Sequence, residues 1–131
     1  MRNCVEKSFR GAFDYLISYP EEFNENKKYP VLMFLHGAGT RGPEMSVLEN
    51  NGNWKRLCEK VGERAIVVAP HCVVVDWNEI MSHLIAFCEE IRSYAFVDTT
   101  RFYLTGNSMG GYGSWELSIL RPEFFAAVVP V

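Results

Sequence analysis

The sequence has no run of apolar residues long enough to span a membrane. Its first ten residues also lack the uninterrupted apolar stretch of a secretory signal, because Arg2, Glu6, Lys7 and Arg10 interrupt them. These two absences predict a cytoplasmic protein with no membrane partner. A signal encoded upstream of Met1 would overturn the expected location.

Clustered cations and closely spaced cysteines are also missing. The net charge is −3 and the pI about 5.6, whereas binding of nucleic acid needs Lys and Arg gathered on one face. Cys4, Cys58, Cys72 and Cys88 are far apart and form no C-x-x-C pair, so neither a zinc site nor a redox motif is indicated. We therefore expect reduced, mostly buried thiols, no nucleic-acid partner, no metal and no organic cofactor.

Nucleotide-binding signatures are absent as well. The sequence contains no G-x-x-x-x-G-K-[ST] loop, and no G-x-G-x-x-G opens its first strand-to-helix unit. Both motifs place backbone N–H groups around phosphates, so their absence argues against a nucleotide-binding protein.

What the sequence does contain is a series of short apolar runs separated by helical patterns. Its 131 residues are 48% hydrophobic, which suffices for one domain that buries roughly two-thirds of its unfolded surface. Apolar runs at residues 31–35, 65–69 and 125–131, and the mostly apolar residues 102–105, are typical of buried parallel strands. We expect one α/β domain over residues 1–131, with a three-layer, mostly parallel sheet, helices on both faces and right-handed crossovers.

Two weaker patterns precede the second of these strands. Residues 9–18 alternate between apolar and polar side chains and predict one or two short strands broken at Gly11. A polar, Gly-rich loop is expected after residue 39. It leads into a short helix over residues 54–61, closed by Gly62.

Two further helices are expected in the second half of the chain. Asp76 and Glu79 have the spacing of a capping box, and apolar residues then recur at helical intervals up to about Tyr94. Another helix follows residues 106–111 and ends near Leu120, where Arg121-Pro122 stops it.

Ser108 occupies the centre of a G-x-S-x-G motif between a predicted strand and a predicted helix. A sharp strand-to-helix turn forces such a serine into strained torsions with its hydroxyl exposed, while Gly106 and Gly110 remove side chains that would collide. A Gly-rich turn in which Ser108 merely caps the helix is the alternative. It leaves a second motif, at residues 36–39, without explanation.

That second motif, His36-Gly37-Ala38-Gly39, follows another buried strand. Acyl transfer needs two backbone N–H donors aimed at the developing oxyanion, one from the residue after the nucleophile and one from such an earlier loop. We predict Met109 as the first donor and Ala38 as the second, with Gly39 as the alternative to Ala38.

The arrangement resembles the α/β-hydrolase superfamily, in particular its esterase branch with phospholipase/carboxylesterase-like, feruloyl and acetylxylan esterase-like proteins and bacterial "predicted peptidases". The resembling segments are residues 29–39, Ala69-Pro70, Asp98, residues 101–111 and residues 122–127. The resemblance implies a serine hydrolase, and implies that this chain covers the amino-terminal portion of such a domain.

The sequence departs from that family after Ser108. The superfamily's triad runs Ser, then Asp or Glu, then His, whereas the 23 residues after Ser108 contain neither Asp nor His. Glu123 precedes the strand whose neighbours normally carry the acid. The chain ends where the family would have about half its catalytic domain left.

Earlier residues are poor substitutes for the missing acid and base. His36 is expected to organise the loop that follows it, and His83 to face solvent or to support packing. His71 follows a strand but has the wrong triad order and position. Asp76 is most simply a helix cap and Asp98 a turn residue.

We therefore expect hydrolysis of a small carboxylic ester through an acyl-serine intermediate at Ser108, with a peptidase of the same fold as the alternative. The rival interpretation is a non-catalytic hydrolase-like fragment, because the general base is missing. We also expect self-association, since the strand at residues 125–129 would present an uncovered apolar sheet edge.

Overall fold

The computed structural model describes residues 4–131, in which six strands form one sheet. The strands are β1 (Cys4–Phe9), β2 (Phe13–Ser18), β3 (Tyr29–Leu35), β4 (Ile66–Pro70), β5 (Val97–Gly106) and β6 (Ala127–Pro130). The α-helices are α1 (Met45–Glu49), α2 (Gly52–Val61), α3 (Met81–Ser93) and α4 (Met109–Leu120). Short 3-10 turns lie at Ala38–Thr40, Trp77–Ile80 and Pro122–Phe124.

The strand order is β1-β2-β4-β3-β5-β6, and the four neighbouring strands β4, β3, β5 and β6 run parallel. β1 and β2 form an antiparallel hairpin, and β2 also pairs antiparallel with β4. The expected mostly parallel α/β sheet is confirmed. All carboxyl ends of the parallel strands meet at one edge, where ligand sites of such sheets lie.

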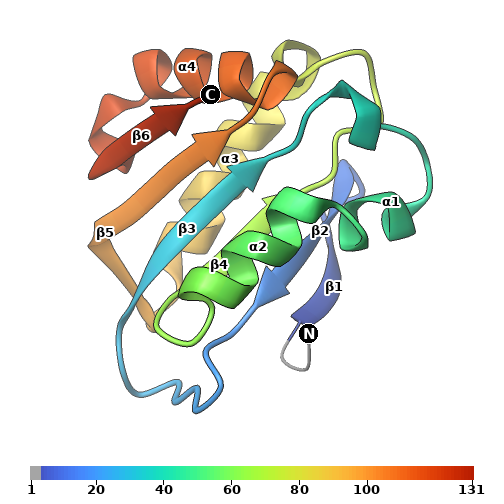
Figure 1. The fold of residues 1–131 in the computed structure, drawn as a ribbon. Helices are drawn as coiled ribbons and strands as arrows, with labels where there is room; N and C mark the ends of the chain where they lie inside the picture. Colours follow the sequence, from blue (N-terminus) through green and yellow to red (C-terminus); the bar gives the residue numbers. More distant parts are fainter. Residues whose placement is uncertain (1–3) are drawn as a thin grey trace.

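Helices cover both faces of the sheet, as Figure 1 shows: α3 and α4 lie behind it in that view, and α2 lies in front. The larger apolar core includes Met33, Phe87 and Phe102 and lies on the α3 face. The smaller core, around Phe34, Leu48 and Trp54, lies on the α1 and α2 face. The continuous apolar strands are explained by this burial on both faces.

The structure changes several element boundaries. Residues 9–18 contain parts of two strands that form a hairpin, and the first of them begins at Cys4 rather than Phe9. Its residues Val5 to Ser8 are exposed because β1 lies at the sheet edge, which explains why no buried pattern marks it. The last strand is shorter than residues 125–131, because the Phe125 N–H still bonds the Pro122 carbonyl in the preceding turn.

Two helical boundaries also differ. The loop after residue 39 contains the short helix α1, with Met45 and Leu48 buried beneath it. Asp76 caps a 3-10 turn, in which its carboxylate accepts the Glu79 N–H at 3.3 Å, and α3 begins only at Met81. Among the residues described, no helix combines the length and apolar character needed to cross a membrane.

Candidate active site

Ser108 lies at the sharp turn between β5 and α4. Its backbone torsions are φ 54° and ψ −117°, a conformation that a residue with a side chain rarely adopts. Its side chain is exposed at the carboxyl edge of the sheet. The turn therefore holds the hydroxyl out of the core and at the amino end of α4, where the helix dipole favours negative charge.

The two glycines of the G-x-S-x-G motif lie where the backbone is most crowded. A Cβ on Gly106 would lie 2.2 Å from the Gly110 carbonyl oxygen, and one on Gly110 would lie 1.8 Å from the Leu35 carbonyl oxygen. Both clashes involve main-chain atoms, which cannot rotate away. The close packing of α4 against β5 and β3 therefore depends on these two positions having no side chain.

The loop after β3 lies directly beside Ser108. Leu35 is paired with Gly106 in the parallel register of β3 and β5, so both strands end at the same level. A Cβ on Gly37 would lie 3.4 Å from the Asn107 carbonyl oxygen and 3.8 Å from the Ser108 Cβ. The two sequence motifs are thus brought together, as expected from neighbouring strands.

His36 is fully buried at the base of this loop and has a defined tautomer. Its Nε2 accepts the Cys72 N–H at 2.9 Å, so the ring proton lies on Nδ1, which donates to the Gly37 carbonyl at 2.8 Å. Burial lowers the pKa of His36 to about 4, and the imidazole is therefore neutral at physiological pH.

These bonds orient the peptide between Gly37 and Ala38. The Gly37 carbonyl accepts from the His36 ring and from the Thr40 N–H at 3.2 Å. In a trans peptide the next N–H points the opposite way, so the Ala38 N–H is directed away from the His36 ring. Within residues 4–131, the hydrogen bonds found use neither the Ala38 N–H nor the Met109 N–H.

Neither N–H group has a partner among these hydrogen bonds, and Gly39 lies in the same exposed turn as Ala38. The roles of Met109, Ala38 and Gly39 remain predictions, as does the role of Ser108 as nucleophile.

Trp77 connects the two halves of the site, and no pattern in the sequence indicated this. Its indole Nε1–H donates to the His36 carbonyl at 3.0 Å, and its ring lies 4.9 Å from the His36 ring. On its other side, a Cβ at Gly113 of α4 would approach within 2.9 Å of the indole. Trp77 thus fixes the spacing between the His36 loop and the helix that carries Ser108.

A cleft of about 320 Å³ opens beside Ser108. Side chains from the loop after β4 form one wall and the first turns of α4 form the other. Asn78 donates to a Glu116 carboxylate oxygen at 2.6 Å across this cleft. The lining residues are Asp76, Trp77, Asn78, Ser108, Met109, Tyr112, Gly113 and Glu116.

None of the three histidines lines this cleft. The buried His71 Nε2 bonds the Thr40 carbonyl at 2.9 Å, His36 is engaged as described, and His83 is exposed on α3. Asp98 lies at the far end of β5, where hydrogen bonds from Thr100, followed by one from Arg101, lower the pKa of its carboxyl to about 2. In the described part of the chain, no group of three or more acidic, His or Cys side chains is placed to hold a metal ion.

Comparison with known proteins agrees with the geometry. No protein-family model matches the chain. Feruloyl esterase C of Emericella nidulans is 27% identical over 122 residues, which are 88% of this chain and 44% of that protein. A probable feruloyl esterase C of Aspergillus terreus is 28% identical over 121 residues with the same two coverages.

Solved structures extend the likeness to the fold. A thermostable esterase superposes with a TM-score of 0.72 at 26% identity, over 98% of this chain and 40% of its own. Est1E from Butyrivibrio proteoclasticus gives a TM-score of 0.75 at 14% identity, covering 98% of this chain and 50% of its own. The chain has the α/β-hydrolase fold. It is homologous to feruloyl esterases and spans about 44% of their length, so the α/β-hydrolase resemblance drawn from the sequence is confirmed.

Acidification is expected to destabilise this α/β-hydrolase chain through His36. In the folded chain the pKa of His36 is about 4, below the ordinary value of 6.5. Between pH 6.5 and pH 4 the unfolded chain therefore binds a proton at His36 that the folded chain does not bind. The free energy of unfolding found above pH 6.5 should therefore decrease by on the order of 2–3 kcal/mol by pH 4.5. Urea unfolding at pH 7, 5.5 and 4.5 measures this loss.

The matched control is His36→Asn, whose amide can still donate toward the Gly37 carbonyl but cannot titrate. This variant should be less stable at pH 7, because the Cys72 N–H loses its acceptor. Its stability should also fall less steeply with pH. Equal pH dependence in the two proteins would show that His36 does not titrate in this way.

Proposed function

We propose that the chain carries the nucleophile and the oxyanion-binding loop of a serine hydrolase that acts on carboxylic esters. The strained, exposed Ser108 beside the His36 loop supports this proposal above all other observations. The Ser108 hydroxyl attacks the ester carbonyl, the Ala38 and Met109 N–H groups stabilise the oxyanion, and the alcohol leaves from an acyl-serine. Each such donor contributes about 3–4 kcal/mol to transition-state stabilisation.

An ester is favoured over a peptide bond by the relatives. Feruloyl esterases match 88% of this chain, and the ester of an aromatic acid is therefore the first substrate class to test. The peptidase alternative rests on dipeptidyl-peptidase 5 of Porphyromonas gingivalis, 29% identical over 126 residues but with only 18% of its length covered.

The 131-residue chain by itself is proposed to lack turnover. A serine hydroxyl needs a general base to accept its proton, and no histidine lies in the cleft beside Ser108. Loss of the base in such a triad lowers turnover by about a millionfold. The base and acid are proposed to come from sequence outside these 131 residues, in keeping with the share of the relatives that the chain spans.

For the isolated chain, we expect hydrolysis of p-nitrophenyl acetate no faster than by its Ser108→Ala variant. The oxyanion donors alone assist attack by water as readily as attack by Ser108, so removing the hydroxyl changes nothing. Initial rates of nitrophenolate release measure both proteins. A clearly faster unsubstituted chain would contradict the missing base, and a His71→Ala variant would then identify its source.

The nucleophile itself is tested by a single covalent event that needs no turnover. Paraoxon transfers its diethylphosphoryl group to a serine oxygen as p-nitrophenolate leaves and the serine proton passes to solvent. At alkaline pH we expect Ser108 to be modified at least about tenfold faster than Ser46, an exposed serine on α1 that has no oxyanion site. Peptide mapping by mass spectrometry measures both sites, and equal labelling would contradict the proposed nucleophile.

A further inference from the structure

Cys4 and Cys58 lie on the same side of the sheet although 54 positions separate them in the sequence. Cys4 begins the edge strand β1, and Cys58 lies in the last turn of α2, which covers that face. Both side chains are half-buried and pack against the smaller apolar core around Trp54. The fold therefore places both thiols in one layer between strand and helix.

Ser18 links the two cysteines. It is directly opposite Cys4 in the antiparallel register of β1 and β2, so the two side chains share one face with Cβ atoms roughly 4.5–5.5 Å apart. The Ser18 side chain also forms a hydrogen bond with the Cys58 thiol. The charge of Cys4 also acts on the Cys58 thiol, so the two cysteines are near neighbours, and a disulfide requires their Cβ atoms to approach to about 4 Å.

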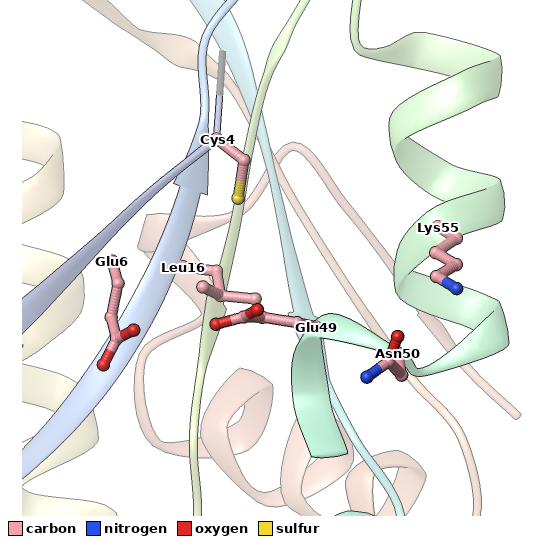
Figure 2. A pocket seen from close by; sticks show the side chains of 6 residues that line it. All are labelled: Cys4, Glu6, Leu16, Glu49, Asn50 and Lys55. Carbon is pink, nitrogen blue, oxygen red and sulfur yellow. The ribbon is translucent and has the colours of Figure 1, made fainter. Parts of the chain in front are cut away.

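The space around Cys4 leaves it accessible. Figure 2 shows its thiol directed into a pocket of about 380 Å³ between β1, β2 and the start of α2. The pocket is lined by Cys4, Glu6, Leu16, Glu49, Asn50 and Lys55. A small oxidant can reach Cys4 through this opening.

The other two cysteines belong to the opposite core. Cys88 contacts the Met33 sulfur at 3.7 Å, and the Cys72 thiol bonds the Val74 carbonyl at 3.8 Å. Both pack in the α3-face core and are separated from Cys4 and Cys58 by the sheet. Cys4 and Cys58 are therefore the two cysteines that pack in the layer on the α2 face.

We propose that Cys4 and Cys58 form a disulfide when the chain meets a glutathione disulfide buffer. The Cys4 thiolate attacks one sulfur of glutathione disulfide and releases one glutathione. The Cys58 thiolate then attacks the Cys4 sulfur of this mixed disulfide and releases the second glutathione. Two protein protons are lost, and the oxidant takes up the two electrons.

The bond joins the edge strand to α2 and closes a loop of 55 residues, counted from Cys4 to Cys58. Closing so long a loop removes conformational freedom mainly from the unfolded chain. Burial raises the pKa of both thiols, to about 12 for Cys58. Formation of the bond is therefore slow at neutral pH and accelerates as the pH rises.

The test is oxidation of the purified chain by glutathione disulfide at pH 8.5. We expect an intact mass lower by about 2 Da and one peptide pair joining Cys4 to Cys58. The melting temperature should rise by about 10 °C over the reduced chain. Cys4→Ser and Cys58→Ser variants should show neither the peptide pair nor the rise.

Three outcomes would overturn the proposal. They are a mixed glutathione disulfide on Cys4 that persists beside a reduced Cys58, a bond between any other two cysteines, and an internal bond that lowers the melting temperature. Near-ultraviolet circular dichroism of the reduced variants verifies that they are folded, so that their failure to form the bond reflects the missing thiol.

Discussion

Replacing Gly110 by alanine is expected to destabilise the chain by at least about 3 kcal/mol, enough to unfold much of a marginally stable domain. The added Cβ would lie 1.8 Å from the Leu35 carbonyl oxygen and 2.8 Å from that of His36. These are backbone atoms at the ends of neighbouring elements, so relief requires α4 to move away from β3. Chemical denaturation followed by tryptophan fluorescence measures the loss.

Gly39→Ala is the matched control for this prediction. Gly39 lies in the adjacent loop after β3, where an added Cβ meets nothing within 4 Å and the torsion φ is not positive. Its substitution should change the unfolding free energy by less than about 0.5 kcal/mol. If the Gly110→Ala variant were as stable as the Gly39→Ala variant, this result would contradict the close approach of α4 to β3 at Gly110.

The second large effect concerns self-association of the 131-residue chain. We propose that two copies pair along β6, which forms the edge of the described sheet next to β5. Val129 is 59% exposed on this strand and Val131 is 77% exposed just beyond it. An apolar edge strand with unpaired N–H and C=O groups is a template for another strand, and antiparallel pairing of β6 with β6 closes a two-fold dimer.

The surfaces flanking β6 add to this tendency. On the α2 face, a groove of about 490 Å³ runs over the strands, with Leu32, Tyr103 and Val129 in its lining. On the opposite face, Tyr112 and Trp115 of α4 are 82% and 61% exposed. Burying such surfaces between two copies removes apolar area from water at roughly 25 cal/mol per Å².

Light scattering across a dilution series is expected to give a mass above that of the monomer at high concentration. Val129→Lys should weaken association at least about tenfold, because a lysine on an edge strand would be buried unpaired in the dimer. Lys substitution at Val5, on the opposite edge strand β1, is the control and should leave association unchanged. A monomer mass at all concentrations, without binding of a hydrophobic dye, would contradict the proposal.

The features that sequence patterns predicted are those fixed by local chemistry. Residues 31–35 and 65–69 are apolar throughout and largely buried, residues 102–105 are apolar except for Thr105, and the structure confirms each as a parallel strand. The turn at Ser108 was predictable because glycines two residues on either side are required by the crowding of that turn.

The features that were missed depend on contacts between distant residues. Trp77 bonds the His36 carbonyl across 41 positions, and the sequence shows it only as a residue near a helix start. The edge strand β1 is mostly exposed, so Val5 to Ser8 carry no apolar signal. Helix α1 is five residues long, which is too short for a helical period of apolar residues to be recognised in the sequence.

Val131, directly after β6, is hydrogen-bonded to the turn that holds Ser108. The Ser108 N–H donates to the Val131 carbonyl, and the Val131 N–H donates to the Gly106 carbonyl, both at 2.9 Å. Each local opening of the segment that holds Val131 releases the amide proton of Ser108 to solvent. Hydrogen–deuterium exchange at this one amide therefore measures how often the hydrogen bonds between Val131 and the turn at Ser108 open.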